Sequence, residues 1–341
     1  MNQTNTNRHK FPRATQITMA IVLVLSSFTL ANEASACAAC GCLVSKDWQA
    51  QGISSEPGFS LGLSYDYIRQ DQPMIGTHSA SINALLSNNP NASEVEQLTT
   101  TSTTTLDVNY NDDNWGVDLQ LPYMSRYHET YPDGTVLNTS QSNSLGDARV
   151  IGRYSGLSSD QTLGLMLGVK LPTGPSNITF SDGSLLDRSL QPGTGSTDVI
   201  VGVSKSGQVG KYGWFVQGLY QTAIATLSDI QGEYKPGDSM SLNIGVRYAT
   251  FGQKVTPMLQ INAVSRRADS GTAATPLVTG GELVYLTPGV SARLGGATTG
   301  FAFLQIPIYQ NVNASDAGAA LGSGAQLTAK SIVSLGIKHS F

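Results

Sequence analysis

The only cysteines of the chain, Cys37, Cys40 and Cys42, lie within one short segment. Thiolates at this spacing are ligands for a soft metal ion such as Cu(I) or Zn. In an oxidising compartment two of them would instead form a disulfide, and Cys37 would be a lipid attachment site if processing made it the first residue. Covalent haem is not expected, because Gly41 stands where the attachment motif requires His. A soft metal ion is thus the one cofactor that the cysteines suggest. A disulfide and a lipid anchor remain open as alternative roles for them.

Hydrolytic chemistry is not predicted. An esterase site on a strand would need Ser and His on one face, two residues apart, because neighbouring side chains point to opposite faces. The sequence contains no His-x-Ser pair, and His339 is directly followed by Ser340. A phosphate-binding Gly-Lys-[Ser/Thr] motif is also missing. We therefore expect the protein not to be an enzyme.

The N-terminus has the pattern of an export signal. Arg8, Lys10 and Arg13 precede an apolar stretch over 17–30, which ends before Ala34-Ser35-Ala36. A basic region, a short apolar core and a small-x-small site are typical of a secretory signal peptide, and the core is shorter than the ~20 residues of a spanning helix. The predicted organisation is a signal peptide over 1–36, a periplasmic cysteine-containing segment over 37–57, and one further domain over 58–341.

The composition favours a membrane barrel for that domain. Charged residues make up 13% of the 341 residues, about half the usual ~25%, and 36 residues are glycine. A nucleic-acid partner is not expected, because the net charge is -4 and no basic block occurs. Few charges with much glycine suit a transmembrane β-barrel, where apolar residues occupy alternate positions.

Alternation with a period of two runs through the chain. In 59–67, for example, aromatic or leucine residues alternate with Ser, Gly and Asp, which gives one apolar and one polar face. About twelve such segments occur, and each is long enough to cross a bilayer at a ~45° tilt. The approximate spans are 58–69, 98–110, 115–127, 145–157, 162–172, 196–205, 212–223, 239–250, 254–266, 282–294, 299–310 and 329–341.

The connections between these segments alternate between short and long. We therefore predict an all-β fold, a transmembrane antiparallel β-barrel of about 12 strands with short periplasmic turns and long external loops, in the cell outer membrane. The terminal Phe341, which follows apolar residues at alternate positions, is typical of chains read by the barrel assembly machinery. A secreted β-sandwich also alternates, but it requires neither this loop rhythm nor the terminal Phe.

The face opposite the lipid-facing side chains would line the lumen. By alternation, both charged and apolar residues point inward; Met124, Met166, Phe215, Met258, Phe303 and Tyr309 are the apolar ones. The charged residues have two interpretations: they pair across the lumen and hold the wall, or they line a pore that steers solutes. The candidate lumen-lining residues are Asp66, Asp118, Arg126, Asp147, Arg149, Arg153, Lys170, Asp198, Arg247 and Arg293.

Short motifs occur in order at the ends of the predicted strands. They are Leu121-Pro122-Tyr123, Gly146-Asp147, the stretch 170–174 (Lys-Leu-Pro-Thr-Gly) and the stretch 193–198 (Gly-Thr-Gly-Ser-Thr-Asp). Together they resemble the outer-membrane transporter family named for the meta-pathway of phenol degradation. The resemblance covers about 58–341 and implies passage of small, often hydrophobic molecules.

Two functions follow as hypotheses. The first is an outer-membrane channel for passive passage of small hydrophobic or aromatic molecules. The alternative is an accessory barrel whose cysteine-rich N-terminus binds metal or docks a periplasmic redox partner. The expected partners are outer-membrane lipid, the barrel assembly machinery and a small-molecule solute; the sequence does not give the oligomeric state.

Overall fold

The structure is a computed structural model, and it describes residues 57–88, 95–131, 136–229, 231–248, 254–276, 279–314 and 325–341. The predicted signal peptide and nearly all of the predicted cysteine-containing segment lie outside these residues. In the described part, no helix is both long enough and apolar enough to cross a membrane.

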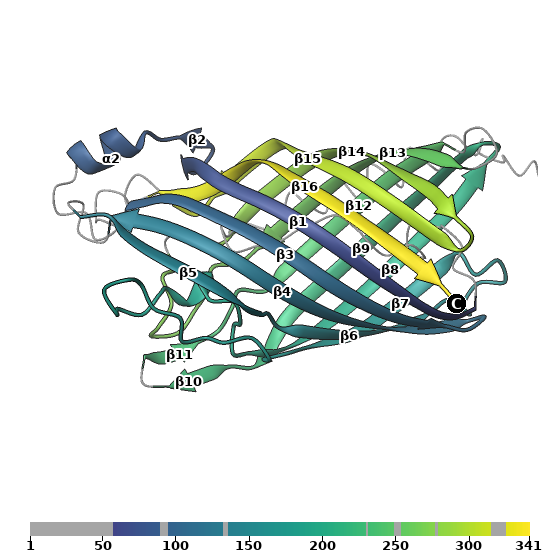
Figure 1. The fold of residues 1–341 in the computed structure, drawn as a ribbon, viewed down its shortest axis with the longest axis horizontal. Coiled ribbons are helices and arrows are strands. Elements are labelled where there is room, and N and C mark those ends of the chain that lie inside the picture. Colours follow the sequence, from purple (N-terminus) through teal and green to yellow (C-terminus); the bar gives the residue numbers. More distant parts are fainter. Residues whose placement is uncertain are drawn as a thin grey trace, which may run out of the picture. The chain divides into compact units, whose positions relative to one another are not determined.

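The described residues form a closed antiparallel barrel of 12 strands, as the alternation predicted (Figure 1). The first strand closes the barrel by pairing with the last, for example Leu63 with Ile337. Two short strands, β5 and β6, pair with successive parts of β4 and together serve as one wall strand. The wall consists of β1 (Gly58–Ile75), β3 (Val95–Asn111), β4 (Trp115–Tyr131), β5 (Asn138–Leu145) with β6 (Ala148–Tyr154), β7 (Leu163–Leu171), β8 (Thr197–Val209), β9 (Tyr212–Ala225), β12 (Ser239–Tyr248), β13 (Val255–Arg266), β14 (Gly281–Gly295), β15 (Thr298–Val312) and β16 (Gln326–Ser340).

Smaller elements lie in the long connections between wall strands. They are β2 (His78–Ser79), α2 (Ile82–Asn88), the 3-10 helix η2 (Arg188–Leu190), β10 (Leu227–Asp229) and β11 (Gly232–Tyr234). The opposite ends of the strands are joined by short turns such as 112–114 and 296–297. We call the two ends of the barrel the long-loop end and the short-turn end.

The period of two places apolar side chains on the outer surface. In β1, Leu63 is 50% exposed, whereas Asp66 is 3% exposed and faces the interior. Aromatic side chains gather on the outside near the short-turn end, where the ring of Tyr110 packs at a tilt against Phe59 and Trp115, with ring-centroid distances of 4.9 and 5.4 Å. An apolar surface with an aromatic border is the exterior of a barrel that sits in lipid.

Several strands run beyond this apolar surface. We predicted that the first strand ends near 69, but β1 continues to Ile75, and two of its outward positions, Arg69 and Asp71, are charged. Asp71 lies 3.0 Å from Arg69 Nε and 3.5 Å from Lys330 Nζ. Exposed charges do not belong in a hydrocarbon layer, so this part of the wall projects past it at the long-loop end.

One expected inward side chain faces outward because of a bulge. Between β14 and β15, Val284 pairs with Tyr309 and Tyr285 pairs with Pro307, which leaves Ile308 as an extra residue. An extra residue shifts the alternation by one position. Phe303 therefore faces inward as predicted, at 5% exposure, whereas the prediction for Tyr309 is wrong and its side chain is 43% exposed.

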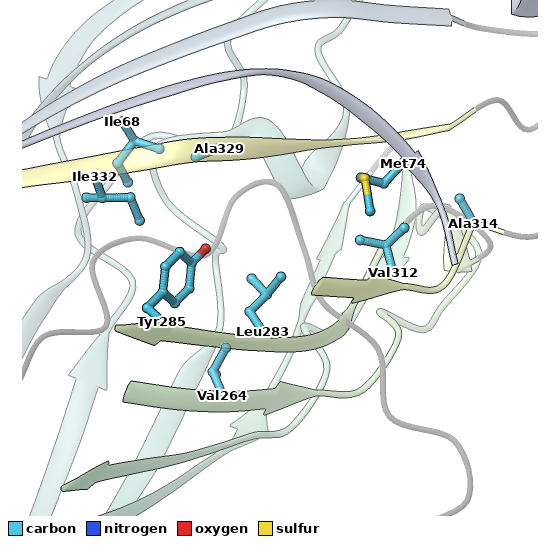
Figure 2. Packing of buried hydrophobic residues seen from close by; sticks show 9 residues of the cluster. All are labelled: Ile68, Met74, Val264, Leu283, Tyr285, Val312, Ala314, Ala329 and Ile332. Atoms are coloured by element: carbon cyan, nitrogen blue, oxygen red, sulfur yellow. The ribbon is translucent and has the colours of Figure 1, made fainter. Parts of the chain in front are cut away.

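The interior near the long-loop end holds the main apolar cluster (Figure 2). Side chains from β1, β13, β14, β15 and β16 point toward one another there, with Leu283 and Tyr285 of β14 at the centre of the view. Because alternation alone would make this inner face polar, the cluster shows that one side of the lumen is packed as a core. Its members are Ile68, Met74, Val264, Leu283, Tyr285, Val312, Ala314, Ala329 and Ile332.

Candidate functional site: the internal cavity

The barrel encloses a cavity of about 480 Å³. Near the long-loop end its lining includes Pro236 and Gly237, and near the short-turn end it includes Asp107 and Lys338. Between them it follows the inner faces of β1, β3, β4, β6 to β9, β12 and the end of β13. A volume of this size falls within the usual range for small-molecule sites, roughly 300–1,000 Å³.

Most of the predicted lumen-lining residues border this cavity. The eight that do so are Asp66, Asp118, Arg126, Asp147, Arg149, Arg153, Lys170 and Asp198. The other two are not among its lining residues: Arg247 is partly buried with its side chain over Gly213, and Arg293 is exposed. Of the inward apolar residues, Met124 and Met166 also line the cavity.

Lys170 is the centre of a buried charge network. Its Nζ lies 2.9 Å from Asp147 Oδ2 and 3.4 Å from Asp198 Oδ1, and all three side chains are at most 8% exposed. Nζ also donates to Thr194 Oγ1 and, at 3.1 Å, to Ser196 Oγ. Buried charges are tolerated when they are paired and hydrogen-bonded, and here each charge has several partners.

Asp147 also holds the loop between β7 and β8. Its Oδ1 accepts the backbone N–H of Gly174 at 3.1 Å, and its Oδ2 accepts the N–H and the hydroxyl of Thr194 at 3.0 and 2.9 Å. The two ends of the loop meet so closely that a Cβ at Gly193 would lie 2.8 Å from Gly174 Cα. Only glycine allows this approach of two backbones. The sequence motifs around these residues are therefore the parts of one buried junction.

The loop itself enters the interior. Ser189, Gln191 and Pro192 line the cavity, and Leu190 is 1% exposed. Arg126, which projects inward from β4, donates to the carbonyl of Leu190 through Nη1 and to Thr101 Oγ1 through Nε at 3.1 Å. This cation therefore fixes the loop.

Residues that sequence reasoning did not select hold the neighbouring loops. Arg188 pairs with Asp229 of β10, and Arg266 at the end of β13 pairs with Asp269. Asp269 also accepts the hydroxyl of the buried Tyr234 at 2.7 Å. The Arg188–Asp229 and Tyr234–Asp269 contacts join residues 41 and 35 positions apart, so no local pattern in the sequence pointed to them.

Arg153 and Arg149 lie on the same strand, β6, but differ in their partners. Arg153 Nη2 is 3.3 Å from Asp118 Oδ2, which also accepts Gln120 Nε2 at 2.7 Å. Arg149 is exposed to the cavity, and no hydrogen bond or ion pair joins its guanidinium to any residue that the structure describes.

On the other side of the interior, amide side chains form a chain of hydrogen bonds along the wall. Asn262 donates to Asn243 Oδ1 at 2.7 Å and to Gln260 Oε1 at 3.2 Å, and its own Oδ1 accepts Thr287 Oγ1 at 2.6 Å. The nearby inward residue Gln305 is 0% exposed, and neither of its amide atoms has a partner in the described chain.

The predicted metal site is not tested by the structure. Cys37, Cys40 and Cys42 lie outside the described residues. Within the described ranges, no group of three or more His, Cys, Asp or Glu side chains is arranged to hold a metal ion.

The barrel is similar to solved outer-membrane proteins. An outer membrane channel from Pseudomonas putida F1 matches with a TM-score of 0.61 and 12% identity, over 84% of this chain and 97% of that chain. A toluene transporter from Ralstonia pickettii matches with a TM-score of 0.43 and 11% identity, over 84% and 90%. The first likeness supports the fold, and the second is too distant to support an argument. No family model matches the chain, and no curated protein matches it.

Proposed function

We propose that this protein is an outer-membrane channel through which small hydrophobic or aromatic molecules pass down their concentration gradient. The observation that carries the proposal is the cavity: it lies inside a closed barrel with an apolar exterior, and its lining extends from the long loops to the short-turn end. Lipid and the solute are the partners that this role requires.

The lining of the cavity favours a solute with an apolar body. Methionine, isoleucine and leucine side chains, among them Met124 and Leu219, alternate with charged and amide groups around it. Methionine adapts its shape to different apolar surfaces, which suits a passage that accepts several related molecules. The proposal includes no catalytic step.

The resemblance to the transporter family of the meta-pathway for phenol degradation agrees with this function and stays a prediction. The sequence hypothesis of a metal-binding or docking N-terminus also stays a prediction, because the cysteines lie outside the described residues.

The test is uptake of a radiolabelled aromatic solute by Gram-negative cells that produce the protein, compared with cells that lack it. Met124→Trp places a large ring in the cavity, whereas the matched Leu165→Trp places it on the outer surface, where Leu165 is 43% exposed. We expect the first variant to reduce uptake several-fold and the second to leave it unchanged. Equal uptake by both variants would exclude this cavity as the route.

A further inference from the structure

Arg149 offers hydrogen-bond donors that nothing in the described chain uses. A guanidinium carries five N–H donors in a planar fork that matches a carboxylate. The side chain faces the cavity, and no described group accepts from it. The other cavity cations have assigned acceptors: Lys170 bonds to two aspartates, Arg153 to Asp118, and Arg126 to Leu190.

The nearest carboxylates do not fill that role. Asp147 and Asp198 both interact with Arg149 electrostatically, but their oxygens are occupied. Asp147 accepts from Gly174, Thr194 and Lys170. Asp198 accepts Ser196 Oγ at 2.6 Å and Gln221 Nε2 at 2.5 Å. The charges around Arg149 are therefore balanced, and within the described residues its donors have no acceptor, so they can serve one that enters the cavity.

An apolar patch lies next to Arg149 on the inner faces of β6, β7 and β8. It begins at Ile151, the next inward-facing residue of β6 after Arg149. Ile151 of β6 and Ile200 of β8 flank Gly168 of β7, because Ile151 pairs with Gly168 and Gly168 pairs with Ile200. In the next row, the side chains of Met166 and Leu219 meet over Gly202, where a Cβ would lie 3.0 Å from Met166 Cε and 2.5 Å from Leu219 Cδ2.

Because Gly168 and Gly202 have no side chains, the larger neighbouring side chains lie over them, with Ile151 Cγ1 3.0 Å from the position of a Cβ at Gly168. All four residues of this apolar patch line the cavity: Ile151, Met166, Ile200 and Leu219.

We propose that Arg149 and this patch form a binding subsite for an organic monoanion, a carboxylate attached to a compact apolar or aromatic body. The carboxylate would accept two parallel N–H bonds from Arg149, and the body would lie on the patch. The inference rests on the proposed channel function and names one class of solute for it.

The test is a binding titration of the folded, detergent-solubilised full chain, followed by NMR relaxation of the added molecule. Three probes separate the contributions: benzoate, the neutral benzyl alcohol, and acetate, which has the charge but no apolar body. Arg149→Gln removes the cation and Arg149→Lys keeps the charge without the fork. Arg247→Gln is the matched control, because Arg247 loses the same charge and does not line the cavity.

We expect wild-type protein to bind benzoate at least ~10-fold more tightly than benzyl alcohol or acetate. Arg149→Gln should weaken benzoate binding by ~10-fold or more, Arg149→Lys should weaken it less, and neither should alter benzyl alcohol binding. Arg247→Gln should have no effect. Benzoate affinity that is unchanged in Arg149→Gln, or reduced equally in Arg247→Gln, would overturn the subsite.

This result is independent of the uptake assay. Arg149-dependent benzoate binding without uptake of any aromatic solute would leave the subsite and remove the channel function. Uptake of an aromatic solute together with benzoate binding that is unaffected by Arg149→Gln would support the channel function and overturn the subsite. Folding of Arg149→Gln is judged by the heat-dependent shift of the barrel on gels. If this variant does not fold, Arg149→Lys is the test: weaker benzoate binding than in wild type supports the subsite, and unchanged binding overturns it.

Discussion

The two sides of the barrel interior bury polar groups in different ways. On the charged side, formed by β4 and β6 to β8, ion pairs hold loops against the wall and space remains beside them. On the packed side, formed by β12 to β15, amides bond to their neighbours along the wall and large apolar side chains fill the remaining space. Most of the cavity lining lies on the charged side, although Asn243 of the amide chain also borders it. The difference indicates that ion pairs that hold loops leave more open space beside them than lateral amide bonds do.

The largest expected effect on stability comes from removing Lys170, the central cation of the charged side. Lys170→Met would leave Asp147 and Asp198 buried without their shared ammonium group, which should cost about 3–5 kcal/mol of unfolding free energy. Urea unfolding of the protein refolded in lipid vesicles measures this. The control is Lys205→Met, since Lys205 lies 3.9 Å from Asp160 in an exposed pair and should cost less than ~1 kcal/mol. Equal losses would mean that burial does not set the strength of these pairs.

The packed side should resist added volume. A Cβ at Gly245 of β12 would lie 2.1 Å from the ring of Phe215, which is 0% exposed. Gly245→Ala should therefore destabilise the barrel by about 1–3 kcal/mol, because the ring must move within a full interior. Gly152 of β6 faces the outer surface beside Val117, and the nearest atom to a Cβ there is 3.6 Å away, so Gly152→Ala is the control and should be nearly neutral in the same unfolding assay. A tolerated Gly245→Ala would show that the packed side is loose.

The amide chain offers a finer comparison within the packed side. Asn262→Leu leaves Asn243 Oδ1 and the Thr287 hydroxyl without these bonds, although Asn243 keeps its bond to Gln217, and should cost about 1–2 kcal/mol. Gln305→Leu removes an amide that has no partner in the described chain, so it should be neutral or slightly stabilising. Unfolding free energies of the two variants give the comparison. Destabilisation by Gln305→Leu as large as that by Asn262→Leu would mean that Gln305 does have partners, such as bound water.

The sequence predicted the wall better than the interior, for a physical reason. Outward positions such as Leu165 and Val246 follow from alternation, because lipid selects apolar side chains at every second residue. The inward direction of Asp147, Lys170 and Asp198 also follows. Alternation does not tell which charges meet, because Lys170 and Asp198 become neighbours only through the pairing of β7 with β8.

The remaining differences come from breaks in the regular pattern. The extra residue Ile308 reversed the direction of Tyr309, and a single residue of this kind has no strong local signature. The entry of the loop after β7 depends on Arg126 meeting the carbonyl of Leu190, which is 64 residues away. That the guanidinium of Arg149 has no acceptor among the described residues depends on which groups bond to Asp147 and Asp198, and alternation does not give those partners.

The smallest expected effect concerns the loop between β7 and β8 and the ion pair that joins its Arg188 to Asp229 of β10. The pKa of Asp229 is lowered from its ordinary value, first of all by its hydrogen bond with Arg188. Since the pKa of Asp229 is lower in the folded protein, the pair stabilises the folded loop fully above the unfolded value of about 3.9. This stabilisation is lost as the pH falls through the folded pKa. The Arg188–Asp229 ion pair should therefore weaken only below about pH 4.

We expect acidification from pH 6 to pH 3 to change the ion conductance in planar bilayers measurably more in wild type than in Asp229→Asn, where the pair no longer titrates, with a difference below ~2-fold. Asp160→Asn is the control, because the pKa of Asp160 is about 2, lowered mainly by its hydrogen bond with Ser158, and its turn lies at the other end of the barrel. This control should keep the wild-type response. If Asp229→Asn responds to acid as wild type does, the Arg188–Asp229 pair does not hold the loop in place, and the ion pairs deeper in the charged side must fix it alone.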